Sequence, residues 1–411
     1  MRIPLISLIL LILLTFGCDW YIFYRIRKDF VSKWRNKVAW IHGILSLIFW
    51  VILIVFICWP KRNPDEPIVT PMWLLFTFLS VYIPKFIFSL ISLIGSLISK
   101  KQSVRAKCDK WVGLPIALLI FVFIWSGVFY TSTQIDVNKV EIVSDRLPQS
   151  MDGLRILQFS DIHLGTWGND TTFISQFVES INAQNADIVV FTGDFVNRTA
   201  DEMTPFIPVL KRIKAPMGVY SVLGNHDYGG YATWPDKDSY NKNLSYLKSS
   251  IDSLGWVLLC NQTTYIRNNT DSIAMIGVEN WGEPPFNQLG DLVKAYGDSA
   301  NRKPDLNDNV FKVLMTHNPN HWKEVVTKIS NVDLSLAGHT HAMQFMLDFA
   351  GIKWSPSVWK YQQWGGLYSM DFPDKNPMHI YVNIGAGEVG MPARMGSAKP
   401  EINIITLRSK H

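Results

Sequence analysis

The stretch Ile156-Leu157-Gln158-Phe159-Ser160-Asp161-Ile162-His163 joins an apolar run to two polar side chains that can bind a metal ion. Its first half is typical of a buried strand, and its second half lies where that strand ends. The same combination recurs four times. The runs 188–191, 219–223, 313–315 and 334–337 precede Gly193-Asp194, Gly224-Asn225-His226-Asp227, His317 and Gly338-His339-Thr340-His341. Ligands of open α/β sheets gather outside the carboxyl ends of strands, so we expect these side chains to meet.

The segments around these motifs alternate between strand-like and helix-like patterns. Helices are expected at 172–185, 202–214, 240–254, 286–297 and 321–329, and further strands at 273–278, 365–370, 379–385 and 401–408. Alternating units followed by extra strands predict an α/β fold of two stacked mixed β-sheets flanked by helices. We assign this domain to residues 151–411 and a short connector to residues 132–150.

The front of the chain has a different composition. The sequence of 411 residues is 48% hydrophobic, and its mean hydropathy is +0.11, which is high for a soluble protein. Four apolar runs, at 3–24, 38–59, 71–99 and 112–131, are long enough to cross a bilayer core of about 30 Å as helices. Residues 1–131 are therefore expected to form an all-α transmembrane anchor. The first run, with Gly17-Cys18, could instead be a cleaved signal peptide, but a retained helix is the simpler interpretation.

The orientation of the anchor is predicted from the basic residues in its loops. The first loop contains Arg25, Arg27, Lys28, Lys33 and Arg35, and the third contains Lys100, Lys101, Arg105, Lys107 and Lys110. Such loops face the cytoplasm. An even number of crossings then places the domain of residues 151–411 on the extracytoplasmic side of the inner membrane.

Pro84-Lys85 interrupts the third apolar run. We favour a kinked helix whose Lys85 reaches a neighbouring helix or water, although an intramembrane lysine could also be a functional group paired with Asp19 or His42. If this run were a hairpin, the domain would lie inside the cell.

The net charge of +5 is explained by these basic loops. We interpret it as a signature of topology and of contact with anionic membrane lipids, and we expect no nucleic-acid partner. Cys260 is the only cysteine of the soluble domain, so no internal disulfide framework is expected there.

The residue types of the five motifs suit a particular chemistry. Mixed imidazole and carboxylate ligands favour Mn, Zn or Fe over Mg or Ca. Asp194 has two carboxylate oxygens and could bridge two cations. Two ions about 3.5 to 4 Å apart can activate a bridging water and clamp both oxygens of an in-line displacement at phosphorus.

These motifs resemble the calcineurin-like metallophosphoesterase superfamily over about residues 153–408, and the closest likeness is to its bacterial membrane-associated branch. Further markers are Leu154-Arg155-Ile156, Phe191-Thr192-Gly193-Asp194 and the tail from Gly385 through Arg394 to Ile402. The resemblance implies two divalent metal ions. One would be held by Asp161, His163, Asp194 and His341, and the other by Asp194, Asn225, His317 and His339.

The resemblance also implies catalytic roles for two residues that bind no metal. His226 would protonate the leaving group, and Asp227 would orient its ring. Arg394 is a candidate for binding a substrate phosphate, and Arg198 is a weaker one. His321 is expected at the surface or behind the ligands. Ala342-Met343 departs from the pattern, because this branch usually has glycines there, and this puts the shape of the pocket wall in doubt.

An aromatic stretch follows the last motif. It is expected to form partly core and partly an apolar wall that meets acyl chains or the membrane surface. Its residues are Phe345, Met346, Phe349, Ile352, Trp354, Trp359, Tyr361, Trp364 and Tyr368. We therefore expect a membrane-bound hydrolase of a phosphoester or pyrophosphate bond in a lipid or lipid-linked envelope substrate. The alternatives are a phosphodiesterase or phosphatase for soluble substrates and a metal-binding sensor domain without catalysis.

Overall fold

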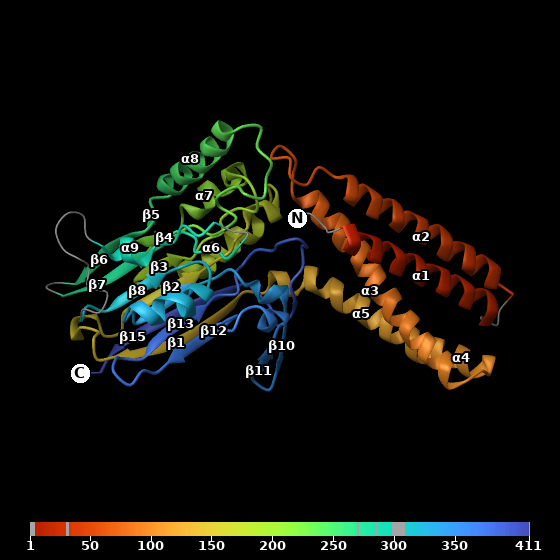
Figure 1. The fold of residues 1–411 in the computed structure, drawn as a ribbon. Coiled ribbons are helices and arrows are strands. Elements are labelled where there is room, and N and C mark those ends of the chain that lie inside the picture. The colour runs from red at the N-terminus through yellow and green to blue at the C-terminus, as the bar shows by residue number, and fades with distance from the viewer. Residues whose placement is uncertain (1–4, 30–32, 269–270, 285–286, 298–308, 411) are drawn as a thin grey trace. The chain divides into compact units, whose positions relative to one another are not determined.

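A computed structural model describes residues 5–29, 33–268, 271–284, 287–297 and 309–410 (Figure 1). The chain forms two compact units. The first contains residues 1–61, 69–129 and 390–393, and the second contains residues 62–68, 130–389 and 394–411. We refer to them as the helical unit and the catalytic unit.

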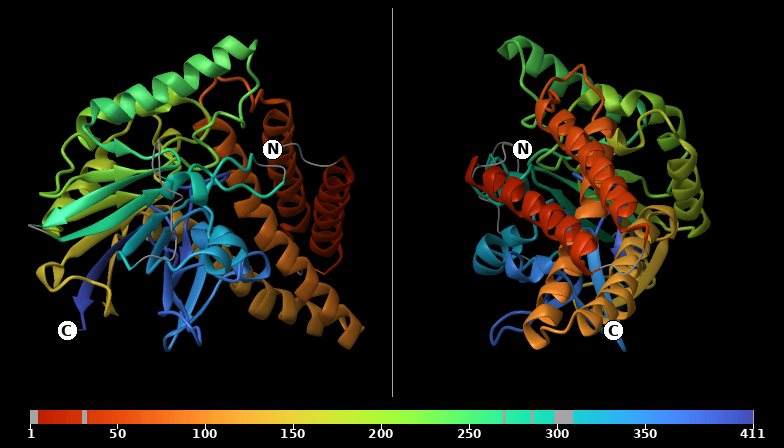
Figure 2. Two further views of the ribbon diagram at one scale, coloured as in Figure 1. Left: turned by 60° about the vertical axis from the view of Figure 1, so that its left-hand side comes forward. Right: turned by 90° about the vertical axis from the view of Figure 1, so that its right-hand side faces the viewer.

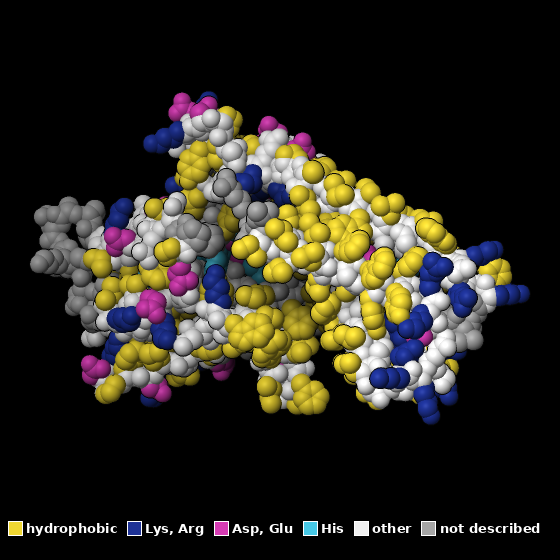
Figure 3. All heavy atoms as spheres, turned by 45° about the vertical axis from the view of Figure 1, so that its right-hand side comes forward, with side chains coloured by type: hydrophobic (Ala, Val, Ile, Leu, Met, Phe, Trp, Pro, Cys, Tyr) yellow, Lys and Arg dark blue, Asp and Glu magenta, His cyan; other side chains and the backbone are white. Residues whose placement is uncertain are grey.

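The helical unit consists of long apolar helices. They are α1 (Leu5–Asp29), α2 (Arg35–Cys58), α3 (Val69–Ile98), the short α4 (Gln102–Cys108) and α5 (Leu114–Phe129). Among the described residues, four helical segments are long and apolar enough to cross a membrane, as predicted. Lys and Arg side chains gather at one end of this unit (Figure 3). The chain is therefore a membrane protein.

Helix α3 runs without a break from Val69 to Ile98, with Pro84 inside it. The hairpin alternative is therefore wrong. Lys85 reaches a neighbouring helix, because its Nζ lies 2.8 Å from Asp19 Oδ1 of α1. The same carboxylate accepts hydrogen bonds from Ser46, at 2.8 Å, and Tyr82, at 2.7 Å. These contacts neutralise and solvate the charges of Lys85 and Asp19, which would be costly among lipid chains.

The catalytic unit contains two six-stranded sheets. The first has the order β1 (Asp136–Ser144), β15 (Glu401–Ser409), β2 (Arg155–Phe159), β3 (Ile188–Phe191), β4 (Val219–Ser221) and β5 (Val257–Leu258). The second has the order β12 (Gly366–Met370), β13 (Met378–Val382), β9 (Leu334–Ala337), β8 (Lys312–Met315), β7 (Asp271–Gly277) and β6 (Gln262–Asn268). A small third sheet joins β11 (Ile352–Trp354), β10 (Phe345–Phe349) and β14 (Met395–Gly396).

The two large sheets stack face to face, as predicted, with helices outside them (Figure 2). Alternate side chains of each strand explain this arrangement. Ile156 belongs to the core between the sheets, whereas Leu157 and Phe159 belong to the outer core under α6 (Thr172–Ala183) and α8 (Lys237–Ser253). Trp322 and Val326 cover the outer face of the second sheet.

Several elements differ from the expectations. Residues 132–150 are more than a connector, because β1 lies within them and pairs in parallel with β15. It is an edge strand and partly exposed, so it lacks the continuous apolar run of a buried strand. The expected helix at 202–214 is mostly a 3-10 helix, Ala200–Phe206, followed by the short α7 (Ile207–Leu210).

The last two expected helices are also shorter or irregular. The helix expected at 286–297 is α9 (Leu292–Tyr296), and residue 286 lies outside the described residues. The segment expected at 321–329 is a π-helix, Trp322–Val326, followed by α10 (Thr327–Ile329).

Candidate metal centre

The five motifs meet at the carboxyl ends of parallel strands. Strands β2, β3 and β4 run parallel in the first sheet, and β8 and β9 run parallel in the second. Gln158 connects the two sheets beside the motifs, since its Nε2 donates to the main-chain oxygen of Ala337 at 2.8 Å. The stacking therefore brings both sets of strand ends to one place, as the sequence predicts.

The first group of side chains has the composition expected for one metal site. Asp161, His163, Asp194 and His341 are buried, and one ligand atom of each lies within 4.8 Å of the others. His341 Nε2 is 3.3 Å from Asp161 Oδ1. His163 Nε2 is 3.5 Å from Asp194 Oδ2.

The second group shares Asp194 with the first. Asp194, His317 and His339 also offer ligand atoms within 4.8 Å of one another. His317 Nε2 lies 3.1 Å from Asp194 Oδ2 and 3.1 Å from Asn225 Oδ1. Asn225 therefore joins this group through its amide oxygen, and one carboxylate lies between the two sets of ligands.

In His163 and His317, a main-chain oxygen beside the ring determines which ring nitrogen carries the proton. His163 Nδ1 is 3.2 Å from Val196 O, and His317 Nδ1 is 2.8 Å from Thr192 O. A proton on each Nδ1 donates to that oxygen and leaves the Nε2 lone pair facing other acceptors. Acceptors that face one another need either a proton or a metal cation between them, and these donor types fit a metal ion.

The pKa values of His163 and His339 agree with this assignment, whereas that of His317 favours a second proton. Burial lowers the pKa of His163 well below its usual range and that of His339 to about 3, which favours the neutral form that binds metal. For His317, burial is outweighed by the carboxylates of Asp194 and Asp161, which raise its pKa to about 9. A bound cation would compete with that proton.

The backbone is strained at the expected ligands. Asp161, His163, Asp194, His339 and His341 have φ values of 50°, 41°, 63°, 75° and 51°. Each left-handed residue of this kind costs about 1–3 kcal/mol, and such residues cluster at functional sites. The strain continues into Ala342 and Met343, with φ values of 49° and 47°. Glycine adopts this conformation without strain, whereas Ala342 and Met343 do not, so these two residues are unusual at positions where the branch has glycines.

Gly193 allows the ends of β3, β4 and β8 to approach closely. Its φ is +98°, and a Cβ there would lie 2.6 Å from Gly224 N and 2.9 Å from His317 Nδ1. Any side chain would push two neighbouring segments of the site apart.

His226 lies beside both groups and is held by the loop that follows β3. Its main-chain nitrogen donates to Asp194 Oδ1 at 2.8 Å, and its Nδ1 lies 2.6 Å from Asn197 O. The expectation that Asp227 orients this ring is not supported. The Asp227 carboxylate instead accepts main-chain N–H groups, including those of Asp194 at 2.9 Å and Gly224 at 2.8 Å. Asp227 thus holds the loops together, and Asn197 orients the ring.

Two tyrosines that the sequence motifs did not reveal contact the expected ligands. The ring of Tyr231 stacks on His226 with centroids 3.9 Å apart and an interplanar angle of 9°. Its hydroxyl accepts from Asn225 Nδ2 at 2.8 Å, which turns Asn225 Oδ1 toward His317. Tyr361 Oη lies 2.9 Å from His339 Nε2. No spacing rule would have found either residue.

Arg394 is fully buried. Its guanidinium donates to the main-chain oxygens of Ile384 at 3.0 Å, Gly387 at 2.8 Å and Ala398 at 3.1 Å. It also lies 3.4 Å from His341 Nδ1. This burial argues against the expected contact with a substrate phosphate, since the side chain has no face toward solvent. The geometry fits a residue that supports the chain next to His341.

Two further residues lie outside the ligand groups. Of the two places expected for His321, the surface is excluded, because the residue is buried; its ring stacks on Trp281, and its Nδ1 lies 3.1 Å from Oγ1 of Thr316, the residue before His317. Arg198 is buried and donates to main-chain oxygens of Asn63, at 3.1 Å, and Glu66. Neither geometry includes a contact with the ligand groups.

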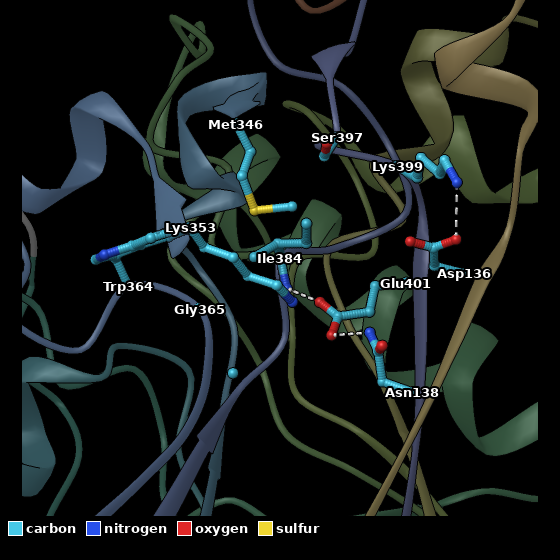
Figure 4. A pocket seen from close by; sticks show the side chains of 11 residues that line it. Asp136, Asn138, Met346, Lys353, Trp364, Gly365, Ile384, Ser397, Lys399 and Glu401 are labelled. Atoms are coloured by element: carbon cyan, nitrogen blue, oxygen red, sulfur yellow. Dashed lines mark hydrogen bonds and ion pairs between the residues drawn. The ribbon is translucent and has the colours of Figure 1, made fainter. Parts of the chain in front are cut away.

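A small pocket lies apart from the two ligand groups. It is lined by residues that include Asp136, Lys353, Lys399 and Glu401, and none of its lining residues is an expected metal ligand (Figure 4). Lys399 pairs with Asp136 at 3.1 Å. Glu401 accepts from Asn138 Nδ2 at 2.8 Å, so its charge is also satisfied within the fold.

Fold and site together define a membrane-anchored protein with a buried Asp/His cluster at the strand ends of two stacked sheets. The chain belongs to the calcineurin-like metallophosphoesterase family, whose members bind divalent metals. The family model for the calcineurin-like phosphoesterase matches residues 154–343. A second model, for a probable calcineurin-like phosphoesterase transmembrane domain, matches residues 1–131.

Relatives are found in bacteria and animals. The chain is 30% identical to the metallophosphoesterase YkuE of Bacillus subtilis over 67% of this chain and 86% of that protein. It is 25% identical to a metallophosphoesterase of Campylobacter jejuni over 97% and 98% of the two chains. A transmembrane protein with a metallophosphoesterase domain from Danio rerio is 27% identical over 82% and 74%.

Proposed function

We propose that this protein is a membrane-bound hydrolase that cleaves a phosphoester or pyrophosphate bond with two divalent metal ions. The observation that carries the proposal is the position of Asp194, whose carboxylate belongs to both ligand groups. Mixed imidazole and carboxylate donors suit Mn, Zn or Fe. Two such ions, when bound, would activate a water molecule and neutralise charge on the phosphoryl oxygens.

Residues of the chain would hold the metal ions and supply the proton for the leaving group. Asp161, His163, Asp194 and His341 would hold one ion, and Asp194, Asn225, His317 and His339 the other. His226 would act as the imidazolium, in which Nδ1–H donates to Asn197 O and Nε2–H is the proton given to the leaving oxygen. Tyr231 holds the imidazole plane by stacking.

A lipid or lipid-linked substrate is supported by the surface of the β10–β11 hairpin and the turn that follows it. Phe349 is 83% exposed, Ile352 is 76% exposed and Trp359 is 79% exposed. Lys353 of the same hairpin adds a positive charge. Aromatic rings beside a lysine suit the boundary between acyl chains and anionic headgroups. The short chain between α5 and β1, residues 130–135, tethers this unit to a membrane helix.

We place the catalytic unit on the extracytoplasmic side of the inner membrane, on the basis of the basic first and third loops. Protease added to sealed right-side-out vesicles should digest the catalytic unit. Protection there, with digestion in inverted vesicles, would overturn this topology.

The activity is tested on the purified full chain by metal analysis and a substrate screen. The screen compares phospholipids, isoprenoid pyrophosphates and nucleoside-diphosphate lipids with soluble aryl phosphates. Asp194→Ala should lose bound metal and turnover, whereas His226→Ala should keep metal and react slowly. Asp252→Ala, at an exposed position of α8, is the matched control and should behave as wild type.

The outcomes separate the candidate functions. Preference for lipid substrates supports the proposal, and turnover of only soluble esters favours the soluble-substrate alternative. Bound metal without turnover of any ester would favour a sensor domain. Unchanged turnover in both Asp194→Ala and His226→Ala would refute the mechanism.

A further inference from the structure

The segment 62–68 connects the membrane helices α2 and α3. By its contacts it belongs to the catalytic unit. Two arginines make the hydrogen bonds that join it to that unit. One is Arg62 of the segment itself. The other is Arg198, which follows Asn197, and the main-chain oxygen of Asn197 lies 2.6 Å from His226 Nδ1. The segment therefore contacts the surroundings of the proposed proton donor.

The first connection runs through Arg198. Its guanidinium donates to Asn63 O at 3.1 Å and to Glu66 O. The neighbouring Asn197 is held from the other side by Glu202, whose carboxylate accepts the Asn197 N–H at 2.5 Å. Arg198 is only 4% exposed, so water competes little for its donors. The position of Asn197 O, and with it the tilt of the His226 ring, depends on these contacts.

The second connection runs through Arg62. Its Nη2 donates to Gly230 O and Ala232 O, both at 3.1 Å, and its Nε donates to Thr233 Oγ1 at 3.0 Å. The N–H of Thr233 donates back to Arg62 O at 2.6 Å. These acceptors surround Tyr231, the residue that stacks on His226. Residues 225–231 form turns and residues 232–233 are irregular, so no helix or strand fixes them otherwise.

We infer that Arg62 and Arg198 are positioning residues that use the α2–α3 segment to hold His226 between Asn197 O and the Tyr231 ring. This inference rests on the proposed role of His226 as the proton donor. A planar guanidinium with several fixed donors suits such a task, because it binds several main-chain oxygens in one geometry. The loop between two membrane helices thus contributes to the catalytic geometry.

The test is the dependence of rate on the leaving group, measured on the full chain in detergent with bound metal. A p-nitrophenyl ester leaves as a stable anion and needs little proton donation, whereas an unsubstituted phenyl ester and an alkyl ester need more. Arg62→Ala and Arg198→Ala should lose about 10- to 100-fold in kcat/KM on the alkyl ester and less than about 3-fold on the p-nitrophenyl ester. His226→Ala should show the same pattern more strongly.

The matched control is Arg212→Ala, which removes an exposed arginine of the same unit that pairs with Glu179. It should leave all rates unchanged. If Arg198→Ala does not fold, Arg198→Lys carries the test, because it keeps the charge and loses the planar set of donors. Equal losses on all esters in the arginine variants would mean a merely structural link and would overturn the inference.

Failure of the underlying function has a different signature. If the metal-loaded wild type cleaves none of the esters, the proposed activity fails. If the wild type is active and His226→Ala shows the leaving-group pattern while both arginine variants match the wild type, only the positioning inference fails.

Discussion

Replacing Gly193 by alanine should inactivate the protein without unfolding it. The added Cβ would lie 2.6 Å from Gly224 N and 2.9 Å from His317 Nδ1, whereas ordinary contacts begin at 3.4 Å. The neighbouring segments must therefore move by about 0.5 to 0.8 Å. That shift moves His317 and Gly224, the residue before Asn225, so two of the four ligands of the second group, His317 and Asn225, are displaced. Misplacement on the order of 1 Å can reduce a rate about 100-fold, so we expect a loss of about 10- to 100-fold in kcat/KM.

The assay measures hydrolysis of an aryl phosphate ester, bound metal and thermal unfolding of the full chain in detergent. Gly255→Ala is the matched control, because Gly255 also has a positive φ, of +79°, but a Cβ there would meet no heavy atom within 4 Å. It isolates the cost of backbone strain, about 1–2 kcal/mol, from the effect of the close contact. Wild-type kcat/KM and metal content in Gly193→Ala would refute the idea that this close approach sets the ligand geometry.

Three other changes test different parts of the molecule. Ala342→Gly relieves a left-handed residue, by about 1–2 kcal/mol, but removes a fully buried methyl group, worth about 0.8 kcal/mol, so it should change the free energy of unfolding by less than about 1 kcal/mol; a loss of more than about 2 kcal/mol would contradict this. Burial raises the pKa of Glu202 to about 7 from its usual value of 4.5, so its native form keeps a proton that the unfolded chain has lost. The contribution of Glu202 to stability should therefore fall by up to about 3 kcal/mol as pH rises from 4.5 to 7, and the pH dependence of unfolding should be shallower by that amount in Glu202→Gln; an unchanged pH dependence would contradict this. Lys85→Ala leaves the Asp19 carboxylate without its cation and should destabilise the helical unit by about 3 kcal/mol. The double variant with Asp19→Asn should regain most of that stability. Equal melting temperatures of the wild type, the single variant and the double variant would exclude a stabilising pair.

Most of the regular structure around the site could be predicted from the sequence. The strands that precede the ligands are largely buried, so they appear as mostly apolar runs, of which Ile188–Phe191 is uninterrupted. The membrane helices are recognisable for a similar reason, because lipid requires long apolar segments. Edge elements were harder to predict, since β1 is only partly buried and β5 has two residues. Their pairing depends on a neighbour far away in the chain.

The candidate ligands could also be predicted from the sequence, but the residues that hold the site in place could not. Asp161 and His163 are recognisable by their types and by their place after a strand. By contrast, Asn197 and Tyr231 act on His226 from separate loops, and nothing in their local sequence indicates it. The expected contact of Asp227 with the His226 ring has no support in the fold, because its carboxylate accepts main-chain N–H groups that only the folded loops bring to it.

The sequence by itself determined the membrane helices, the stacked-sheet fold and the set of candidate metal ligands, because these depend on local periodicity and on the chemistry of each side chain. Only the tertiary structure decided the partners of those side chains: Asp19 for Lys85, main-chain oxygens for Arg394 and the α2–α3 segment for Arg198. The physical reason is that a polar group is satisfied by whatever the fold brings within about 3 Å of it, and that distance is set by segments far apart in the chain.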